Sequence, residues 1–234
     1  LGASARQYDF MLRGLEETAS EAHKLNIPFY LLRGLPDTEI PAFAKKIGAG
    51  AVVTDFSPLA IGRTWRTHVA RALHCPLYEV DAHNIVPCRV ASEKREFGAY
   101  TLRPKIKKML PHFLIEFPRV TKQNAKWTHE VPHIDWNKLR ESIPTDADAP
   151  PVSWLTSGAK AAHRVLTSFV TKNGIGYDER RNNPTETGQS NLSPYIHFGQ
   201  IAAQRIALSV SASALPKKDK DAYLEELIVR RELS

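Results

Sequence analysis

Hydroxyl, amide and apolar side chains alternate in Gly188-Gln-Ser-Asn-Leu-Ser-Pro194, a short loop that precedes a helical pattern beginning near Ile201. The start of a helix presents unpaired N–H groups and a partial positive charge, so such a loop suits a phosphate or pyrophosphate. Ser190 and Ser193 could bond an anion directly or could cap the helix, and most hydroxyl-rich loops before helices are only caps. The loop alone therefore leaves both interpretations open.

A tyrosine and an arginine lie upstream of this loop. Tyr177 and Arg181 are four residues apart, so one helical turn would bring both side chains onto one face. The phenol offers a stacking surface and a hydrogen-bond donor, while the guanidinium offers a planar fork for phosphate. A bare pair of this kind is typical of an exposed helix surface, so the spacing permits an anion site without requiring one.

A further chemical group lies in the helical pattern of residues 224–233. Its apolar stripe directs Tyr223, Glu226 and Arg230 to the opposite face of the helix. From periodicity alone, Glu226 and Arg230 form a solvated i,i+4 ion pair that contributes about 0.3–0.5 kcal/mol. The stripe itself consists of Leu224, Leu227 and Ile228.

Helices and strands alternate in the part of the chain before these groups. Apolar residues at helical spacing predict three helices there, over residues 6–24, 39–47 and 61–73. Short apolar runs predict three strands, at residues 27–32, 51–56 and 76–81. This alternation predicts an incomplete doubly wound parallel sheet with right-handed crossovers. The later helices are predicted over residues 158–170, 194–209 and 219 to the end.

A proline-rich segment separates the two parts of the chain. Because it also contains Trp127 and Trp136, we expect a partly helical connector that packs on neighbouring surfaces rather than a disordered linker. The chain should therefore comprise a partial α/β domain at 1–90, a connector at 91–150 and the first part of an all-α domain at 151–234. Since the sequence starts without Met and stops within a helical pattern, we expect a fragment.

Composition sets wider limits on function. The chain has 234 residues, 42% of them hydrophobic, and a formal net charge of +7, which is compatible with an anionic partner such as nucleic acid. Cys75 and Cys88 lie in or beside apolar runs, so we expect buried free thiols in a reducing, intracellular compartment. The nine histidines show no ligand spacing, and we predict no metal. No apolar run reaches the length of a membrane span.

Three long motifs carry a resemblance to one family. The segment Asn191-Leu-Ser-Pro-Tyr-Ile-His-Phe-Gly-Gln-Ile-Ala-Ala-Gln-Arg205 resembles the flavin-binding segment of the class II cyclobutane-pyrimidine-dimer photolyases, which are light-driven DNA-repair flavoproteins. Residues 80–98 and 224–234 are similar to the same family. The resemblance covers nearly the whole chain and implies an internal piece of such an enzyme.

The resemblance implies reduced FAD as the cofactor. In the family, the loop matching residues 189–193 contacts the phosphates and ribitol of the flavin, and an upstream tyrosine also holds it. The implied cofactor-binding residues are Tyr177, Arg181, Gln189, Ser190, Asn191, Leu192 and Ser193. A second, antenna chromophore is present in some relatives, and we assign it no residues.

The resemblance also implies a role for the later helix. A glutamate matching Glu226 is the catalytic residue that donates a hydrogen bond to the pyrimidine dimer, which requires a pKa raised by desolvation. Arg230 would lie at the cavity mouth, toward the lesion or the DNA phosphates, and some relatives carry Trp at that position.

The implied activity is repair of UV-damaged DNA. The enzyme would flip the dimer out of the duplex and split it by electron transfer from excited reduced FAD. The resemblance further implies a monomer, nuclear in a eukaryote, and a fragment that is inactive without the rest of the fold. A cryptochrome-like photoreceptor without repair activity and a simple nucleotide-binding or protein-interaction module stay open as alternatives.

Overall fold

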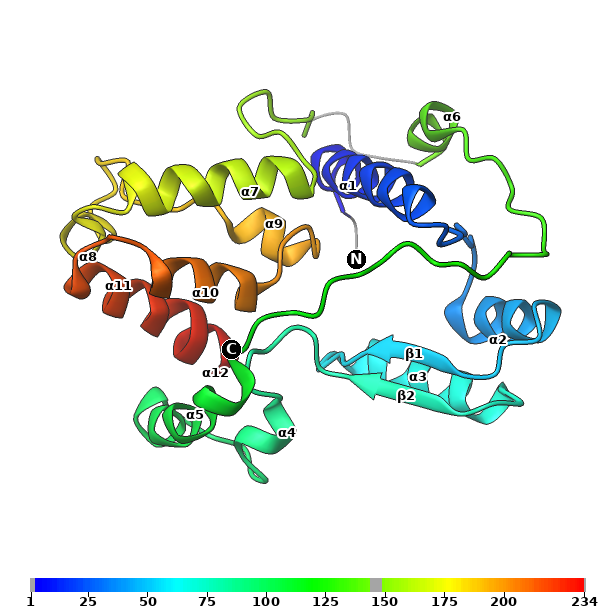
Figure 1. The fold of residues 1–234 in the computed structure, drawn as a ribbon, viewed down its shortest axis with the longest axis horizontal. Coiled ribbons are helices and arrows are strands. Elements are labelled where there is room, and N and C mark those ends of the chain that lie inside the picture. Colours follow the sequence, from blue (N-terminus) through cyan, green and yellow to red (C-terminus); the bar gives the residue numbers. More distant parts are fainter. Residues whose placement is uncertain (1–2, 144–148, 234) are drawn as a thin grey trace.

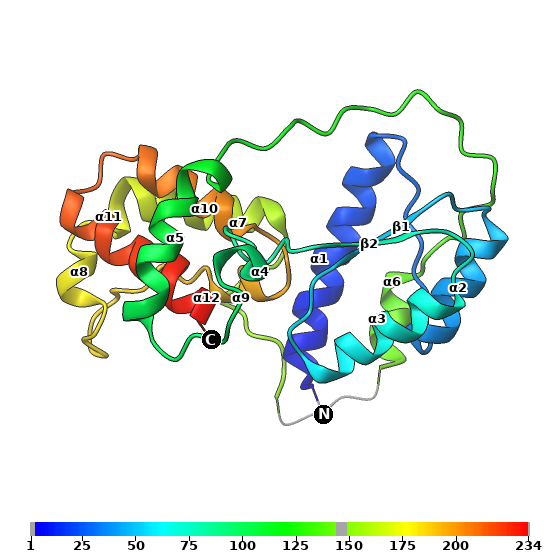
Figure 2. The same ribbon diagram turned by 90° about the horizontal axis from the view of Figure 1, so that it is seen from below.

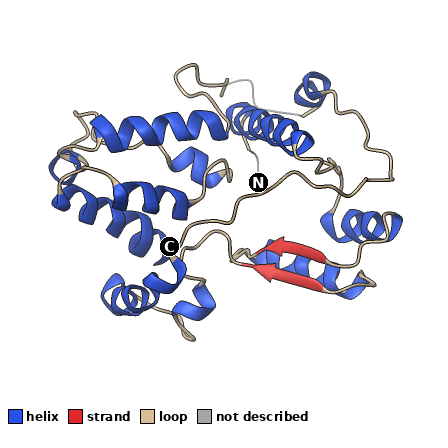
Figure 3. Ribbon diagram, in the orientation of Figure 1, coloured by secondary structure: helices blue, strands red, loops and turns tan. Residues whose placement is uncertain are grey.

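The computed structural model describes residues 3–143 and 149–233. Residues 144–148 of the expected connector and Ser234 of the expected all-α domain lie outside the described residues. Helices dominate the molecule, and one small sheet lies at one side of it (Figures 1 and 3). The expected fold class, an incomplete parallel α/β part followed by an all-helical part, is confirmed.

Two parallel strands form the sheet. Strands β1 and β2 pair in register, with Val52 opposite Leu77 and Asp55 opposite Val80. The helix between them returns the chain to the same edge of the sheet, as the alternating pattern predicts. The elements of this part are α1 (Ala5–Lys24), α2 (Pro36–Lys46), β1 (Val52–Asp55), α3 (Ala60–Ala72) and β2 (Leu77–Val80). Figure 2 shows α1 between the sheet and the later helices.

The strand expected at residues 27–32 is wrong. This segment pairs with no strand in the described part of the chain, and it is half-buried rather than buried. It contacts the connector through side chains instead: the Tyr30 hydroxyl donates to the Glu130 carbonyl at 2.7 Å and accepts from Trp127 Nε1 at 2.7 Å. A run of apolar residues predicts that a segment is buried against a neighbour. It does not predict whether that neighbour is a strand with which the segment can form backbone hydrogen bonds.

The connector is partly helical, as expected. It follows α4 (Cys88–Ala91) and contains α5 (Ala99–Phe113) and α6 (Trp136–Glu141), with a long extended stretch between α5 and α6 (Figure 1). Helix α5 packs against the C-terminal helices, where Arg103 pairs with Glu225 at 2.7 Å. Trp136 is half-buried, whereas Trp127 is exposed.

The helical part depends on buried apolar faces. Ile206, Ala207 and Val210 are fully buried on one face of α10, and Ala162 and Leu166 of α7 are buried in the same core. A fully buried isoleucine, leucine or valine side chain contributes about 1.5–3 kcal/mol. The elements are α7 (Ala159–Ser168), η1 (Phe169–Asn173), α8 (Tyr177–Arg180), α9 (Ser193–His197), α10 (Ala203–Ala212), α11 (Lys217–Leu224), η2 (Glu225–Arg230) and α12 (Arg231–Leu233).

Two helix predictions need correction. The helix expected over 194–209 is two helices, because Gly199 adopts a left-handed φ of 66° and Ala202 is extended, which ends α9 and starts α10 afresh. The last helix begins at Lys217 rather than Asp219, and its middle, η2, is π-helical. Propensity alone does not distinguish these local changes from a regular α-helix.

Glu232 links the two parts of the molecule. Its Oε1 accepts a hydrogen bond from the Ile85 amide at 2.7 Å, on the chain leaving β2. Burial raises the pKa of Glu232 to about 7, against the opposing effects of that amide and of Arg231.

Cys75 and Cys88 are free thiols, but both are half-buried rather than buried as expected.

None of the described helices combines the length and the apolar character that crossing a membrane would require.

Candidate functional site

A cavity of about 340 Å³ lies between α8, the loop before α9 and the helix formed by α11 and η2. It brings together residues from both chemically interesting segments of the sequence. The predicted site residues that line it are Tyr177, Arg181, Gln189, Ser190, Ser193 and Glu226. This shared cavity is the candidate functional site.

Helix α8 presents the first wall. It starts after Gly176, whose φ of 75° is readily adopted by glycine, and it places Tyr177 with only 5% of its surface exposed. The Tyr177 ring packs edge-on against Phe169 and Tyr223, at centroid distances of 5.7 and 5.2 Å. The Arg181 guanidinium carbon lies 6.0 Å from the Tyr177 ring centroid, so the two side chains share one face as predicted. Burial raises the pKa of the Tyr177 hydroxyl, which therefore stays protonated as a donor.

Arg181 and Glu226 pair inside the cavity. Arg181 Nη1 donates to Glu226 Oε1 at 2.7 Å, and the two side chains are 24% and 41% exposed. The desolvated setting that we expected for Glu226 is therefore not present in the described structure. Arg181 Nε is buried and has no hydrogen-bond partner among the described residues. A guanidinium with an unused buried donor is suited to a further anionic or polar ligand.

The loop before α9 forms the second wall. Gln189 Nε2 donates to the Arg181 carbonyl at 2.6 Å, and the Tyr223 hydroxyl donates to Ser190 Oγ at 3.2 Å. Asn191 turns the chain with a left-handed φ of 56°, a conformation that asparagine tolerates better than most residues. The loop is thus fixed from both sides by hydrogen bonds to α8 and α11.

Of the two interpretations of Ser190 and Ser193, capping of the helix is not observed. Helix α9 has only five residues, its N-cap is Leu192, and no side chain caps it. Ser193 is exposed and lines the cavity instead. Leu192 is fully buried in the core and does not line the cavity, so the structure does not bring it together with the other predicted site residues. Leu192, the apolar residue of this polar loop, packs in the core and thereby fixes the position of the loop.

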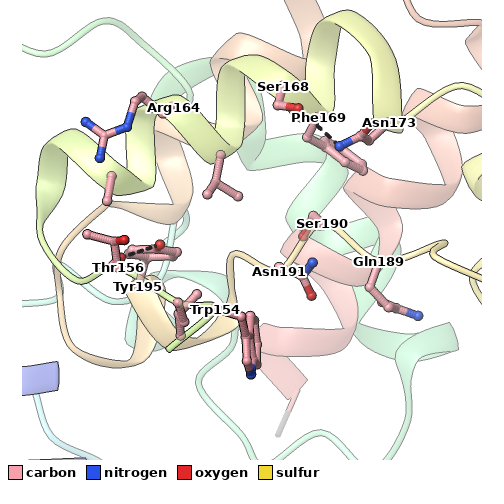
Figure 4. A pocket seen from close by; sticks show the side chains of 13 residues that line it. Trp154, Thr156, Arg164, Ser168, Phe169, Asn173, Gln189, Ser190, Asn191 and Tyr195 are labelled. Carbon is pink, nitrogen blue, oxygen red and sulfur yellow. Dashed lines mark hydrogen bonds between the residues drawn. The ribbon is translucent and has the colours of Figure 1, made fainter. Parts of the chain in front are cut away.

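A second cavity, of about 260 Å³, adjoins the same loop on its other side. Figure 4 shows Ser190 and Asn191 across this cavity from helix α7, with Trp154 near Asn191, while the Gln189 side chain points away from α7. Gln189 and Ser190 line both cavities, whereas Asn191 lines only this one. Asn191 therefore shares a cavity with Gln189 and Ser190, but it lies outside the cavity lined by Arg181 and Glu226.

The π-helical turn changes what the later helix presents. A π-helix bonds residue i to i+5, so residues four apart no longer stack as in an α-helix. Arg230 is exposed and lies outside the cavity lining, while Arg231 lines it together with Glu226. The predicted Glu226–Arg230 ion pair is consequently wrong, and Glu226 pairs with Arg181.

Sequence reasoning missed several residues of the cavity. Tyr223 lies three residues before Glu226, so its place on the same face was visible in the spacing. Leu227 looked like a core residue, and it serves both the core and the cavity lining. Arg231 gave no signal, because its position depends on the π-helical turn.

Comparison with known proteins identifies the family. The model of the family described as DNA photolyase matches residues 2–123. The chain is 46% identical over 237 residues to a deoxyribodipyrimidine photo-lyase of Potorous tridactylus, covering 100% of this chain and 44% of the relative. It is 42% identical over 245 residues to a protein of the same name from Arabidopsis thaliana, covering 100% of this chain and 49% of the relative. The chain thus spans about half the length of the curated relatives it matches.

A solved structure supports the fold. The crystal structure of a cryptochrome from Synechocystis sp. PCC6803 is similar with a TM-score of 0.75 and 16% identity, covering 99% of this chain and 50% of that one. At this identity the likeness concerns the fold alone. The match of the family model and the relatives over the whole chain, together with this fold, show that the chain belongs to the DNA photolyase family.

Proposed function

We propose that this chain is part of a class II photolyase that repairs cyclobutane pyrimidine dimers in UV-damaged DNA. One observation carries the proposal: Glu226 lines a single cavity with five of the seven residues assigned to the cofactor, although 45 residues separate Glu226 from Arg181. The relatives named deoxyribodipyrimidine photo-lyase support the same activity. The proposal includes the three-part division at 1–90, 91–150 and 151–234.

The described residues fit reduced FAD as the cofactor. Arg181 has a buried Nε donor without a partner among the described residues, which suits a phosphate oxygen. The hydroxyls of Ser190 and Ser193 and the amide of Gln189 suit ribitol or phosphate oxygens. When bound and excited by light, the reduced flavin supplies the electron that splits the dimer. The protein groups bind and orient it, and an antenna chromophore would bind elsewhere.

Glu226 would contact the dimer. Its carboxylate is held at the cavity by Arg181, and a phosphate that engages Arg181 would compete for that ion pair. Release from Arg181 would free the Glu226 carboxyl group, and the lesion would exclude water from the cavity. The carboxyl group would then form a hydrogen bond with a carbonyl oxygen of the dimer.

DNA would be bound mainly through its backbone. The net charge of +7 supplies sequence-independent attraction, and exposed Arg230, at the end of η2, is placed to meet a phosphate. A dimer already stacks poorly, so flipping it out of the duplex costs less than flipping a normal base. We propose that the protein acts as a monomer inside the cell, in the nucleus of a eukaryote.

The test uses the purified full-length protein. Its absorption spectrum should show bound flavin, and blue light should restore a thymine-dimer oligonucleotide only when the protein is present. Bound flavin without light-dependent repair would favour a cryptochrome-like photoreceptor and contradict the repair function. Absence of flavin would contradict the proposed cofactor as well.

A further inference from the structure

Asp219 is a fully buried carboxylate outside the cavity lining. Its two oxygens accept hydrogen bonds from two backbone amides of another segment: Oδ2 from Gly176 at 2.8 Å and Oδ1 from Asp178 at 2.9 Å. An acidic residue in the first turn of a helix commonly caps its own helix. Asp219 does not, because its carboxylate reaches across from α11 to the start of α8.

The two amides flank Tyr177. Helix α8 has only four residues and therefore cannot hold its own start by internal hydrogen bonds. Asp219 supplies the acceptors that the first amides of this helix lack. It thereby fixes the backbone of Tyr177, and the same turn of chain leads directly to Arg181.

Asp219 also belongs to the opposite wall. Helix α11 continues without interruption into η2, so Asp219, Tyr223 and Glu226 lie on one continuous helix. The buried carboxylate consequently joins the backbone of one wall to the helix of the other. An exposed ion pair between Lys218 and Glu179 joins the same two helices at the surface.

A buried carboxylate is costly unless hydrogen bonds replace its lost hydration. The hydrogen bonds from the two amides offset part of that cost. In an asparagine, the side-chain NH2 group would replace one carboxylate oxygen and would face a backbone N–H, so that two donors would meet. Such an arrangement defines the position of α8 more strictly than apolar packing could.

We propose that Asp219 is a positioning residue, which sets the spacing between Tyr177 and Arg181 on one wall and Glu226 on the other. This inference rests on the proposed function, in which the cavity between those walls takes reduced FAD. Asp219 does not touch the cofactor; it acts through the backbone of α8.

The test is Asp219→Asn in the full-length protein. The dissociation constant for flavin should rise about tenfold, as expected when a hydrogen bond to a charged group is replaced by a mismatched donor. The visible circular dichroism of the bound flavin should change as well, since the ring environment of Tyr177 shifts. At saturating flavin, repair should recover. Gly176→Ala should also raise the dissociation constant, but by a smaller factor. The added methyl group strains the left-handed backbone of residue 176, whose amide donates a hydrogen bond to Asp219.

Three matched variants complete the design. Asp221→Asn removes an exposed carboxylate of the same helix, and Lys218→Met removes the exposed tether between the same two helices; both should leave flavin binding unchanged. Val210→Ala weakens the nearby core without touching the cavity, so it calibrates the effect of general destabilisation.

The inference is overturned if Asp219→Asn leaves flavin affinity unchanged. It is equally overturned if the variant loses flavin only in proportion to its loss of thermal stability, as calibrated by Val210→Ala. A wild-type protein that binds no flavin would instead contradict the proposed function.

Discussion

Arg181 and Glu226 face each other across the cavity, with Nη1 of the guanidinium 2.7 Å from Oε1 of the carboxylate. The Glu226 side chain is 41% exposed, so water screens the pair. An exposed ion pair of this kind contributes less than about 1 kcal/mol. It can therefore be exchanged at little cost for contacts with a bound ligand.

Replacement of Glu226 tests its assigned role. In the full-length protein, Glu226→Ala should lower the repair rate under limiting light about tenfold, because a hydrogen bond to the lesion is lost. Flavin content should not fall, since Arg181 stays available to the cofactor. Glu225→Ala is the matched control, as this neighbouring glutamate pairs with Arg103 instead. An undiminished repair rate in Glu226→Ala would remove the glutamate from the mechanism.

Arg181→Lys should weaken flavin binding about tenfold, because an ammonium group cannot reproduce the planar, multidentate contact of a guanidinium. Fluorescence titration of the apoprotein with flavin measures this change. Retention of wild-type affinity would show that Arg181 contributes only charge.

Arg230→Ala should act on DNA binding rather than on the cofactor. Arg230 is exposed and does not line the cavity, so flavin affinity should stay constant. If the residue contacts one phosphate, the slope of the logarithm of DNA affinity against the logarithm of salt concentration should decrease by about 1. An unaltered slope would place Arg230 outside the DNA contact surface.

Glu232 predicts a pH dependence of stability. Its pKa is raised by burial from 4.5 to about 7 in the folded protein. A carboxyl group with a raised folded pKa contributes stability fully below its unfolded pKa, and this contribution is lost as pH rises through the folded pKa. Between pH 4.5 and 7, wild-type protein should therefore lose up to about 3 kcal/mol relative to Glu232→Gln. Urea unfolding of both proteins across this range measures the difference.

Glu96 provides a control of opposite sign. Its hydrogen bond with Lys105 lowers the pKa of the Glu96 carboxyl to about 2. Its contribution is present above its unfolded pKa of about 4.5 and is lost only as pH falls toward 2. Glu96→Gln should therefore leave the stability change between pH 4.5 and 7 as in wild type. Parallel curves for wild type and Glu232→Gln would contradict the assignment of this transition to Glu232.

Regular elements with strong periodicity were predictable from the sequence. Helix α1 and the paired strands β1 and β2 match their predicted ranges within one or two residues, because apolar spacing reports directly which face is buried. The prediction of a strand at 27–32 was wrong because strand pairing depends on a partner elsewhere in the chain, which the residues of the segment itself do not specify. The break at Gly199 required a left-handed φ that a single glycine permits but does not demand.

The site was predictable where local spacing sufficed. Tyr177 and Arg181 share a face because one helical turn relates them, and that inference needed no tertiary knowledge. The partner of Glu226 was not predictable, because Arg181 is 45 residues away and an α-helical register suggested Arg230. Asp219 lies among lysines in Lys217-Lys-Asp-Lys220, a composition typical of an exposed face, and only the three-dimensional structure shows that it is buried.

The π-helical segment makes the spacing of the last helix intolerant of length changes. A π-helical turn accommodates one extra residue, so the residues after η2 face as they would in an α-helix that is one residue shorter. A residue inserted between Arg230 and Glu232 has no such turn to absorb it and would rotate Glu232 by about 100° about the helix axis. The Glu232 carboxylate would then turn away from the Ile85 amide, and the sheet would lose an attachment to the helices. Such an insertion should therefore be more harmful than a substitution at the same positions.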